Sequence, residues 1–532
     1  MAHLPLTSAL AGSSPVTVFL VIPLAAYCLW SLIQHFSSPL RKYPGPFFAR
    51  WTRLWYLYHA WTGKSQLELE RLHKKHGPIV RISPNIIDVD IPEMIQTMFS
   101  IKGDWLKVCL PKLTRNPQTE FYHGSSALVN GQIVLNIFSQ TDPVRHAKER
   151  KPIAKHYSPA GTALLEPHMD KVITNLCNQL DNRFAGKPSE KGKVFDLGQW
   201  ILFYTWDVVG ATTFSEPIGY LDKGYDFDGT LSNADKAMDY FCVVGTMPFL
   251  DHVFDKNRYY RMGPPGFNTI TGISIQHLID RYQGKDKDTH DPSTPDYLDK
   301  FIEAKKADPD FVDDAQIISW LMVNMIAGAD TTAITIRSAI YFSLRNPRVW
   351  ARLTEEVRAA DFRGRTPPSY KEARALPYLE AVVREALRML PGVSMTLERY
   401  VPAGGHTLPN GDYIPPGNIV GMNPYVTNRN KSVFGEDADD FRPERWLRDE
   451  PGGESEESFQ SRLTRMNKSD LSFGAGSRIC IGRNMGLFQT YKVLVTLLTL
   501  YDIELATDKE WTVINSWFPR QEGLEARITK RA

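Results

Sequence analysis

Apolar residues recur along most of the chain at the three- and four-residue spacing that is typical of helices with one buried face. The longest such segment, Asp314–Arg345, has few helix breakers and predicts a central buried helix. Further helices are predicted from Pro347 onward, over Leu376–Leu390 and over Met485–Tyr501. The pattern therefore predicts a largely helical protein.

Two regions instead carry the short runs of β-branched residues that favour strands. Ile79–Asp90 predicts two strands around a turn at Pro84-Asn85, and residues 397–421 predict short strands separated by Gly and Pro. The expected fold class is mainly α with small β-sheets.

The N-terminal segment has a different pattern. Residues 1–40 contain no Asp, Glu, Lys or Arg, and Val16–Ile33 is almost entirely apolar. As a helix this stretch would rise about 27 Å, close to the ~30 Å of a hydrocarbon core. Arg41 and Lys42 follow it, which predicts a single membrane-spanning helix with the rest of the chain in the cytoplasm. A cleaved signal peptide is the alternative, although no basic residue precedes the segment.

Beyond the stiff Tyr43–Pro46 elbow, no long linker or repeat divides the chain, so residues 41–532 are expected to form one catalytic domain after an anchor at 1–40. Apolar residues make up 42%, enough for a large core, and the net charge of +2 argues against nucleic-acid binding. The five cysteines show no paired spacing, which favours a reducing compartment.

The strongest chemical signal is Phe473–Gly482, a segment with three glycines and a lone cysteine. Glycines allow tight turns and a close approach to a planar ligand. Cys480 precedes a predicted helix, whose first amides favour a thiolate, and Arg478 can meet an anionic carboxylate. The alternative for the segment alone is a glycine loop followed by a structural cysteine.

A second signal lies within the predicted central helix at Ala327–Thr332. Gly328 removes a side chain, and the Thr331 hydroxyl can bind a backbone carbonyl and open a groove. Asp330 and Thr331 then offer an acid and an alcohol for proton delivery. By itself this segment favours threonines packed in a core helix beside a surface aspartate.

In order and content these segments resemble the haem-binding loop and the oxygen-activation motif of the cytochromes P450. The resemblance extends over almost the whole soluble chain and implies the fold of that family. It implies that the Cys480 thiolate binds the iron of haem b, that Phe473 packs beside the sulfur, and that Asp330 and Thr331 act in dioxygen activation.

The haem propionates need cations, and the resemblance assigns Arg478, Arg399 and Arg150 to them. His146 occupies the place of the family's tryptophan, and a histidine can still donate a hydrogen bond.

The segment Glu385–Arg388 places a carboxylate and a guanidinium on one helix face. With Arg445 it resembles the buried ion cluster that stabilises the family's scaffold beneath the cysteine loop.

No Gly-x-Gly-x-x-Gly motif follows a predicted strand. The resemblance implies that electrons come from a separate NADPH-cytochrome P450 reductase. Lys148, Lys151 and Lys155 share one helix face and form a candidate docking surface, or simply a solvated basic face.

The resemblance thus implies a monooxygenase of the endoplasmic reticulum membrane, with a cytosolic catalytic domain, that inserts one oxygen atom from dioxygen into a lipophilic small molecule. The expected pocket walls are 102–138, Met325–Ala329, Gly392–Thr396 and Ile514–Phe518. The stretch from Phe121 to Ser158 is similar to fungal pisatin-demethylase-like enzymes, many of which oxidise secondary metabolites. The alternatives are a haem-thiolate isomerase or dehydratase that needs no dioxygen, and a non-catalytic membrane protein that binds haem and a ligand.

Overall fold

The computed structural model describes residues 15–100, 105, 121–129, 132–185, 192–257, 259–263 and 267–531. Most of the expected 102–138 pocket wall, Cys109 and the first fourteen residues lie outside this set. Helices dominate the described chain and five small sheets accompany them, which confirms the expected fold class.

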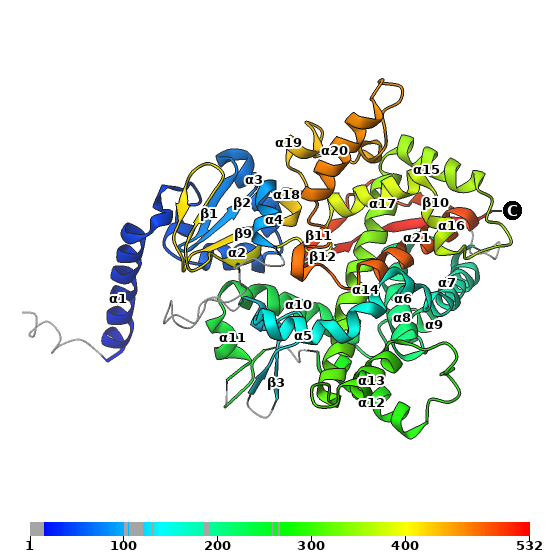
Figure 1. Cartoon of the computed structure of the whole chain (residues 1–532), viewed down its shortest axis with the longest axis horizontal. Helices are drawn as coiled ribbons and strands as arrows, with labels where there is room; N and C mark the ends of the chain where they lie inside the picture. Colours follow the sequence, from blue (N-terminus) through cyan, green and yellow to red (C-terminus); the bar gives the residue numbers. More distant parts are fainter. Residues whose placement is uncertain are drawn as a thin grey trace, which may run out of the picture.

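The predicted central helix is α14 (Asp314–Leu344), which passes through the middle of the molecule (Figure 1). It begins where the Asp313 side chain accepts a hydrogen bond from the Gln316 amide at 2.8 Å. The helices packed against it are α8 (Leu197–Phe214), α12 (Asn268–Gln283), α13 (Tyr297–Ala307), α15 (Pro347–Ala359), α17 (Pro377–Met389) and α21 (Arg483–Leu500). The helices expected after Pro347, over Leu376–Leu390 and over Met485–Tyr501 are therefore confirmed to within two residues.

The remaining helices cover this core and its rim. They are α2 (Leu54–Trp61), α3 (Ser65–His76), α4 (Ile95–Met98), α5 (Pro143–Ala154), α6 (Pro159–Ala163), α7 (Glu166–Leu180), α9 (Tyr220–Lys223), α10 (Thr230–Thr246), α11 (Phe249–Phe254), α16 (Tyr370–Arg374), α18 (Pro424–Thr427), α19 (Lys431–Phe434) and α20 (Glu456–Ser469).

The largest sheet has four strands in the order β1 (Ile79–Ser83), β2 (Ile86–Val89), β9 (Ile419–Met422) and β6 (Leu397–Tyr400). It unites the two regions that the sequence predicted as strands. The smaller sheets pair β10 (Tyr501–Leu505), β13 (Glu525–Lys530) and β5 (Phe195–Asp196); β11 (Thr512–Ser516) with β12 (Phe518–Glu522); β3 (Ala127–Val129) with β4 (Gln132–Val134); and β7 (His406–Thr407) with β8 (Tyr413–Ile414).

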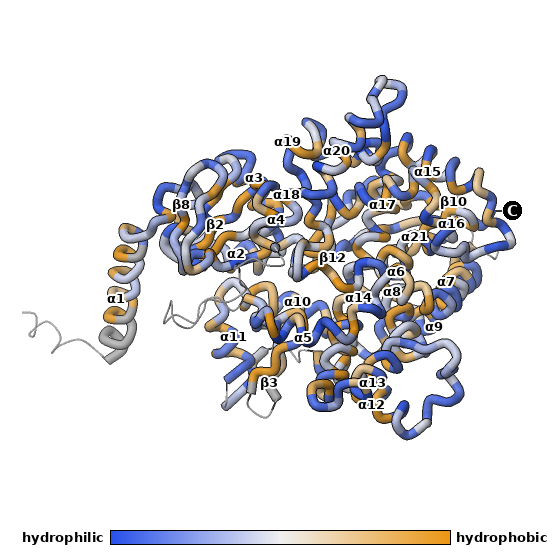
Figure 2. The backbone as a smooth tube through the Cα atoms, viewed as in Figure 1, coloured by the Kyte–Doolittle hydropathy of each residue, from blue (hydrophilic) through white to orange (hydrophobic). Residues whose placement is uncertain are grey.

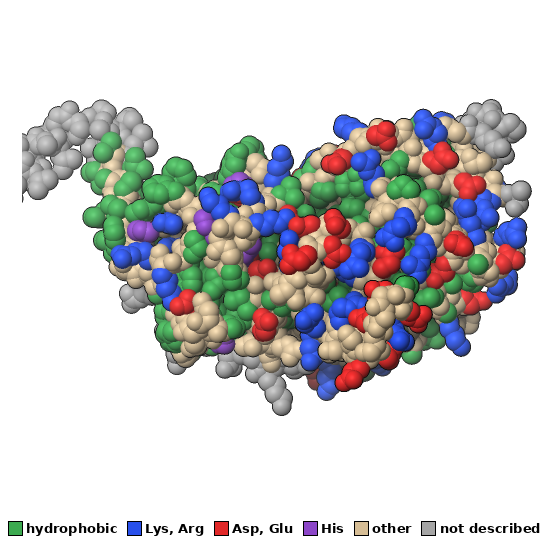
Figure 3. Space-filling view, turned by 90° about the horizontal axis from the view of Figure 1, so that it is seen from above, with side chains coloured by type: hydrophobic (Ala, Val, Ile, Leu, Met, Phe, Trp, Pro, Cys, Tyr) green, Lys and Arg blue, Asp and Glu red, His purple; other side chains and the backbone are tan. Residues whose placement is uncertain are grey.

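Helix α1 (Pro15–Ser37) stands apart from the body at the end that carries β1 and β2 (Figure 1), and its described turns are largely hydrophobic (Figure 2). Hydrophobic side chains also gather at this end of the face shown in Figure 3, whereas acidic and basic residues mix over the rest. Among the described residues, the helix that is long and apolar enough to cross a bilayer is α14, which is enclosed by other helices. The anchor over residues 1–40 stays a prediction.

Candidate functional site

The Phe473–Gly482 loop forms a tight bend that ends one residue before α21. Gly474 and Gly476 adopt φ values of +68° and +61°, and a Cβ atom on Gly476 would lie 1.3 Å from the Phe99 carbonyl oxygen. Only glycine fits there, as the sequence predicted. The Cys480 amide then donates to the Phe473 carbonyl at 2.9 Å, which closes the loop.

Cys480 lies at the end of this loop, and its sulfur faces an internal cavity of about 340 Å³. Burial raises the pKa of the thiol, while the backbone amides of Gly482 and Arg483 and the charge of Arg150 act in the opposite direction. These amides belong to the first turn of α21, which is where a thiolate is favoured.

The same cavity gathers residues that are far apart in the sequence. It is lined by every predicted site residue except Asp330: Cys480, Phe473 and Arg478 from the loop, Thr331 from α14, Arg150 and His146 from α5, and Arg399 from β6. Within α5, the Asp142 side chain caps the first turn and Pro152 lies in the last turn.

Three arginines reach the cavity without an acidic partner. Arg150 donates to the Ile479 carbonyl at 3.0 Å, Arg478 to the Gln140 carbonyl at 2.7 Å, and Arg399 to the Tyr122 hydroxyl at 3.1 Å. No described carboxylate forms an ion pair with any of them. Burial and then the nearby charge of Arg399 lower the pKa of Arg478 to about 10, and Arg150 adds to the effect.

This donor set suits a particular kind of ligand. Three clustered cations are stabilised by a group that carries carboxylates, and a thiol beside helix amides suits a metal that binds thiolate. The described residues could therefore hold a planar metal complex with carboxylate arms.

Helix α14 forms the wall that carries Thr331. The Thr331 hydroxyl donates to the Ala327 carbonyl at 2.7 Å, which is the side-chain bond that the sequence suggested. A Cβ atom on Gly328 would lie 3.0 Å from the Val209 side chain of α8, so this glycine lets the two helices pack closely.

Asp330 does not line the cavity. The indole nitrogen of Trp206 on α8 donates to its carboxylate at 3.0 Å. Burial, followed by the charge of Asp235, raises the pKa of Asp330 to about 7. The structure therefore separates Asp330 from the other predicted residues.

Aromatic side chains form much of the remaining wall. Tyr122, Phe138, Phe241 and Trp517 pack with ring centroids 5.4 to 6.0 Å apart, and Phe518 lies beside them. The sequence did not reveal Phe241, because a helical stripe in α10 has no feature that distinguishes a cavity wall from core. Of the expected pocket segments, Ile326–Gly328, Gly392, Val393, Trp517 and Phe518 line the cavity, whereas Met325 is buried in the core.

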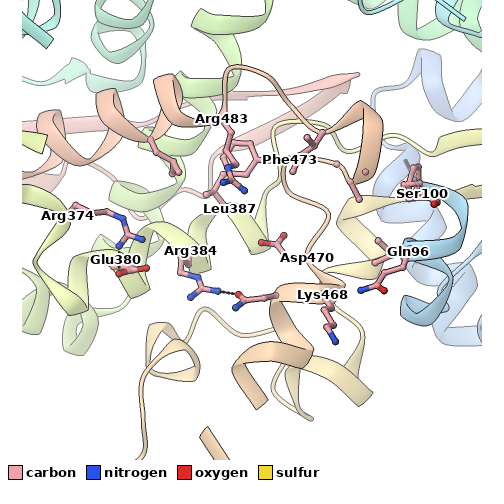
Figure 4. A pocket seen from close by; sticks show the side chains of 18 of the residues that line it. Gln96, Ser100, Arg374, Glu380, Arg384, Leu387, Lys468, Asp470, Phe473 and Arg483 are labelled. Carbon is pink, nitrogen blue, oxygen red and sulfur yellow. Dashed lines mark hydrogen bonds and ion pairs between the residues drawn. The ribbon is translucent and has the colours of Figure 1, made fainter. Parts of the chain in front are cut away.

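A separate groove of about 700 Å³ lies against the other side of the cysteine loop (Figure 4). Its charged lining residues are Arg374, Glu380, Arg384, Lys468, Asp470 and Arg483. Arg374 points toward Glu380, and Arg384 donates to Asn467. The sequence did not reveal this groove.

The ion cluster around Glu385 forms as expected. Glu385 accepts hydrogen bonds from Arg388 at 2.9 and 2.8 Å and from Arg445 at 2.9 Å, and all three side chains are at most 1% exposed. Trp446 also donates to Glu385, at 2.8 Å. The charges of the two arginines outweigh burial and lower the pKa of Glu385.

The comparisons with known proteins agree with this site. The family model "Cytochrome P450" matches residues 44–523. The chain is 43% identical to cytochrome P450 monooxygenase cfoH of Aspergillus candidus over 98% of this chain and 94% of that protein. It is 33% identical to cytochrome P450 monooxygenase mfmA of Annulohypoxylon moriforme, with 92% of each chain covered. It is 34% identical to mpaDE of Penicillium roqueforti over 93% of this chain but only 55% of that longer relative. The chain belongs to the cytochrome P450 family, and its relatives identify it as a haem-thiolate monooxygenase.

Proposed function

We propose that this chain binds haem b through Cys480 and inserts one oxygen atom from dioxygen into an uncharged, lipophilic small molecule of fungal secondary metabolism. The observation that carries the proposal is that the Cys480 thiol and the Thr331 hydroxyl face one cavity.

In this proposal the Cys480 thiolate is the iron ligand, and the haem supplies dioxygen activation when it is bound. Arg478, Arg399 and Arg150 neutralise its two carboxylates, and His146 adds a hydrogen bond. The supporting observation is the absence of described carboxylate partners for the three arginines. Phe473, which also faces the cavity, keeps water away from the sulfur.

Thr331 and Asp330 handle protons. Thr331 lines the cavity, and its hydroxyl donates to the Ala327 carbonyl. The hydroxyl would turn from that carbonyl into the cavity to pass its proton on, and would take another proton from the interior of the protein. Asp330 is the adjacent acid, and its raised pKa suits a group that gives and regains a proton near neutral pH.

The substrate is inferred from the cavity wall. The described charged residues that line the cavity are the arginines assigned to the haem, so the described part of the wall offers the substrate no further charge. Aromatic rings such as Phe241 and Trp517 offer apolar contact and edge-to-face packing.

We further propose that residues 1–40 anchor the catalytic domain, residues 41–532, to the cytosolic side of the endoplasmic reticulum membrane. Exposed side chains of α1 such as Leu24 and Leu29, which are 63% and 60% accessible, support a lipid contact.

Electrons come from an NADPH-cytochrome P450 reductase that docks near the cysteine loop. The exposed Lys148, Lys151 and Lys155 support this arrangement, because their helix is bonded to that loop through Arg150.

The Thr331→Val variant tests the reaction. It keeps the shape of the side chain but removes the hydroxyl, so NADPH use should continue while product per NADPH falls about tenfold or more. The purified holoenzyme is assayed with reductase on the substrate found by comparing metabolites of strains with and without the protein. Ser343→Ala on the same helix, outside the cavity, is the matched control. Unchanged coupling in Thr331→Val, or product formed without dioxygen, would contradict the proposal.

A further inference from the structure

Asp330 is held by side chains from elements other than its own helix. Trp206 of α8 donates to one carboxylate oxygen at 3.0 Å, and an indole N–H can only donate. Asp330 is partly accessible and is not among the residues that line the cavity.

An ion cluster lies beside this acid. Arg520 of β12 contacts Asp235 at 3.2 Å and Asp239 at 3.5 Å, and both carboxylates belong to α10. The side chains of Asp235 and Asp239 are about half exposed, at 46% and 47%, whereas that of Arg520 is 23% exposed. The cluster is therefore partly open to solvent.

The strand β12 is tied directly to α14. The Gln521 amide donates to the Ile334 carbonyl and to the Ser338 hydroxyl, both at 3.0 Å. Ile334 lies one turn after Asp330, so these bonds hold β12, the strand that carries Arg520, against the turn of α14 that follows Asp330.

The charges that face Asp330 act in opposite directions. Asp235 raises the pKa of Asp330, whereas the Trp206 N–H, Arg337 on α14 and Arg520 lower it. Arg337 is buried, donates to the Gly198 carbonyl at 2.8 Å, and also feels Asp196 and Glu522. Asp235 has its own pKa raised by burial and by Asp239, which Arg520 opposes.

We propose that Asp235 and Arg520 are positioning residues that set the charge of Asp330 and so regulate its supply of protons. Asp235 favours the protonated acid and Arg520 favours the carboxylate. Asp330 releases one proton toward Thr331, becomes a carboxylate, and takes one proton back from solvent. This inference rests on the role proposed above for Asp330.

Infrared titration of the holoenzyme tests the inference without turnover. The infrared band of the protonated Asp330 carboxyl group is identified as the band that is lost in Asp330→Asn. Its intensity as a function of pH reports the charge of Asp330. Asp235→Asn should move the midpoint of this band down by about one pH unit, and Arg520→Gln should move it up by about as much, because each removes one unit charge a short distance away. Arg520→Lys should restore the original midpoint.

Asp239→Asn is the matched control, because Asp239 shares the helix and the arginine partner but is not among the charges that act directly on Asp330. Its shift should be the smallest of the set. Midpoints that move in the same direction in Asp235→Asn and Arg520→Gln, or that do not move, overturn the inference, because structural damage cannot produce opposite signs.

The pH profile of coupling separates this inference from the proposed function. If the band shifts as expected and the product formed per NADPH shifts with it, both hold. If the band shifts while coupling keeps its pH profile, Asp330 does not supply the proton, and the proposed role of Asp330 fails with the regulation of proton supply.

Discussion

Two groups of charges, one centred on Glu385 of α17 and one made of the cavity arginines and Asp330 of α14, are built differently. Around Glu385, each charge meets an opposite one, and the remaining donors of Arg388 bond to the carbonyls of Asn428, Ala438 and Asp440. The pKa of Glu385 is consequently lowered in spite of complete burial.

The arginines that line the cavity, and Asp330 on the neighbouring α14, lack this balance of charges. Arg478 lies near Arg399 and Arg150, and its pKa is lowered to about 10. The pKa of Asp330 is raised to about 7, and its direct hydrogen-bond donor is the neutral indole of Trp206. Burial acts on both groups, so the opposite pKa shifts of Glu385 and Asp330 come from whether each charge has an oppositely charged partner. A fully paired cluster stabilises the scaffold, whereas an unbalanced one is ready to bind a ligand or move a proton.

The largest expected effect is in the paired cluster. Glu385→Gln leaves Arg388 buried without a counter-charge and leaves Arg445 with Asp437 alone, which should lower the free energy of unfolding by about 3–5 kcal/mol. Urea unfolding of the holoenzyme, followed by circular dichroism and haem absorbance, measures the change.

The control for this variant is Glu380→Gln on the same helix. Glu380 pairs with Arg374, and both side chains are about one third exposed, so the loss should stay below about 1 kcal/mol. Equal losses for the two variants would mean that pairing in the buried cluster has no special value.

The next largest effect is a gain in stability, expected for Asp330→Asn, and its size depends on pH. Asp330 has a folded pKa of about 7 against about 3.9 when unfolded. The folded state therefore binds the proton more tightly, and stability falls as pH rises from about 4 to about 7. Asp330→Asn, which still accepts from Trp206, should stabilise the protein by about 2–4 kcal/mol at pH 8 and hardly at all near pH 4.

Glu385 should behave in the reverse way. Its pKa is lowered in the folded state, so its contribution is present above about pH 4.3 and is lost as the pH falls through the folded value. Unfolding curves of Asp330→Asn and Glu385→Gln, recorded from pH 4 to pH 8, compare the two groups. If the difference in free energy of unfolding between wild type and Asp330→Asn does not vary with pH, the pKa of Asp330 is not raised in the folded state.

The sequence predicted the features that depend on short-range chemistry. Gly474 and Gly476 could be placed in a tight bend because only glycine tolerates those φ values. The resemblance added the Glu385 cluster, whose third member, Arg445, lies sixty residues away.

The rest depends on contacts between distant segments, for which the sequence carries no local signal. Trp206 precedes its partner Asp330 by 124 residues, and Arg520 follows Asp235 far along the chain. The local sequence around an indole on an apolar helix, or around an arginine on a short strand, does not indicate whether that side chain has such a partner. Asp330 and Thr331 were therefore treated as one pair, although only Thr331 lines the cavity.

The smallest expected effect concerns the unbalanced arginines. Arg478→Gln removes one charged donor from the proposed haem carboxylates, so the affinity for haem should fall about tenfold, as expected for a hydrogen bond to a charged group. It also removes the repulsion from Arg399 and Arg150, so the haem-free protein should lose no stability. Transfer of haem to excess apomyoglobin measures the first quantity, and urea unfolding of the haem-free protein measures the second. Arg465→Gln, an exposed change on α20, should alter neither. If Arg478→Gln instead destabilised the haem-free protein as strongly as it weakened haem binding, Arg478 would belong with the scaffold, and the contrast between the two groups of buried charge would not hold at this residue.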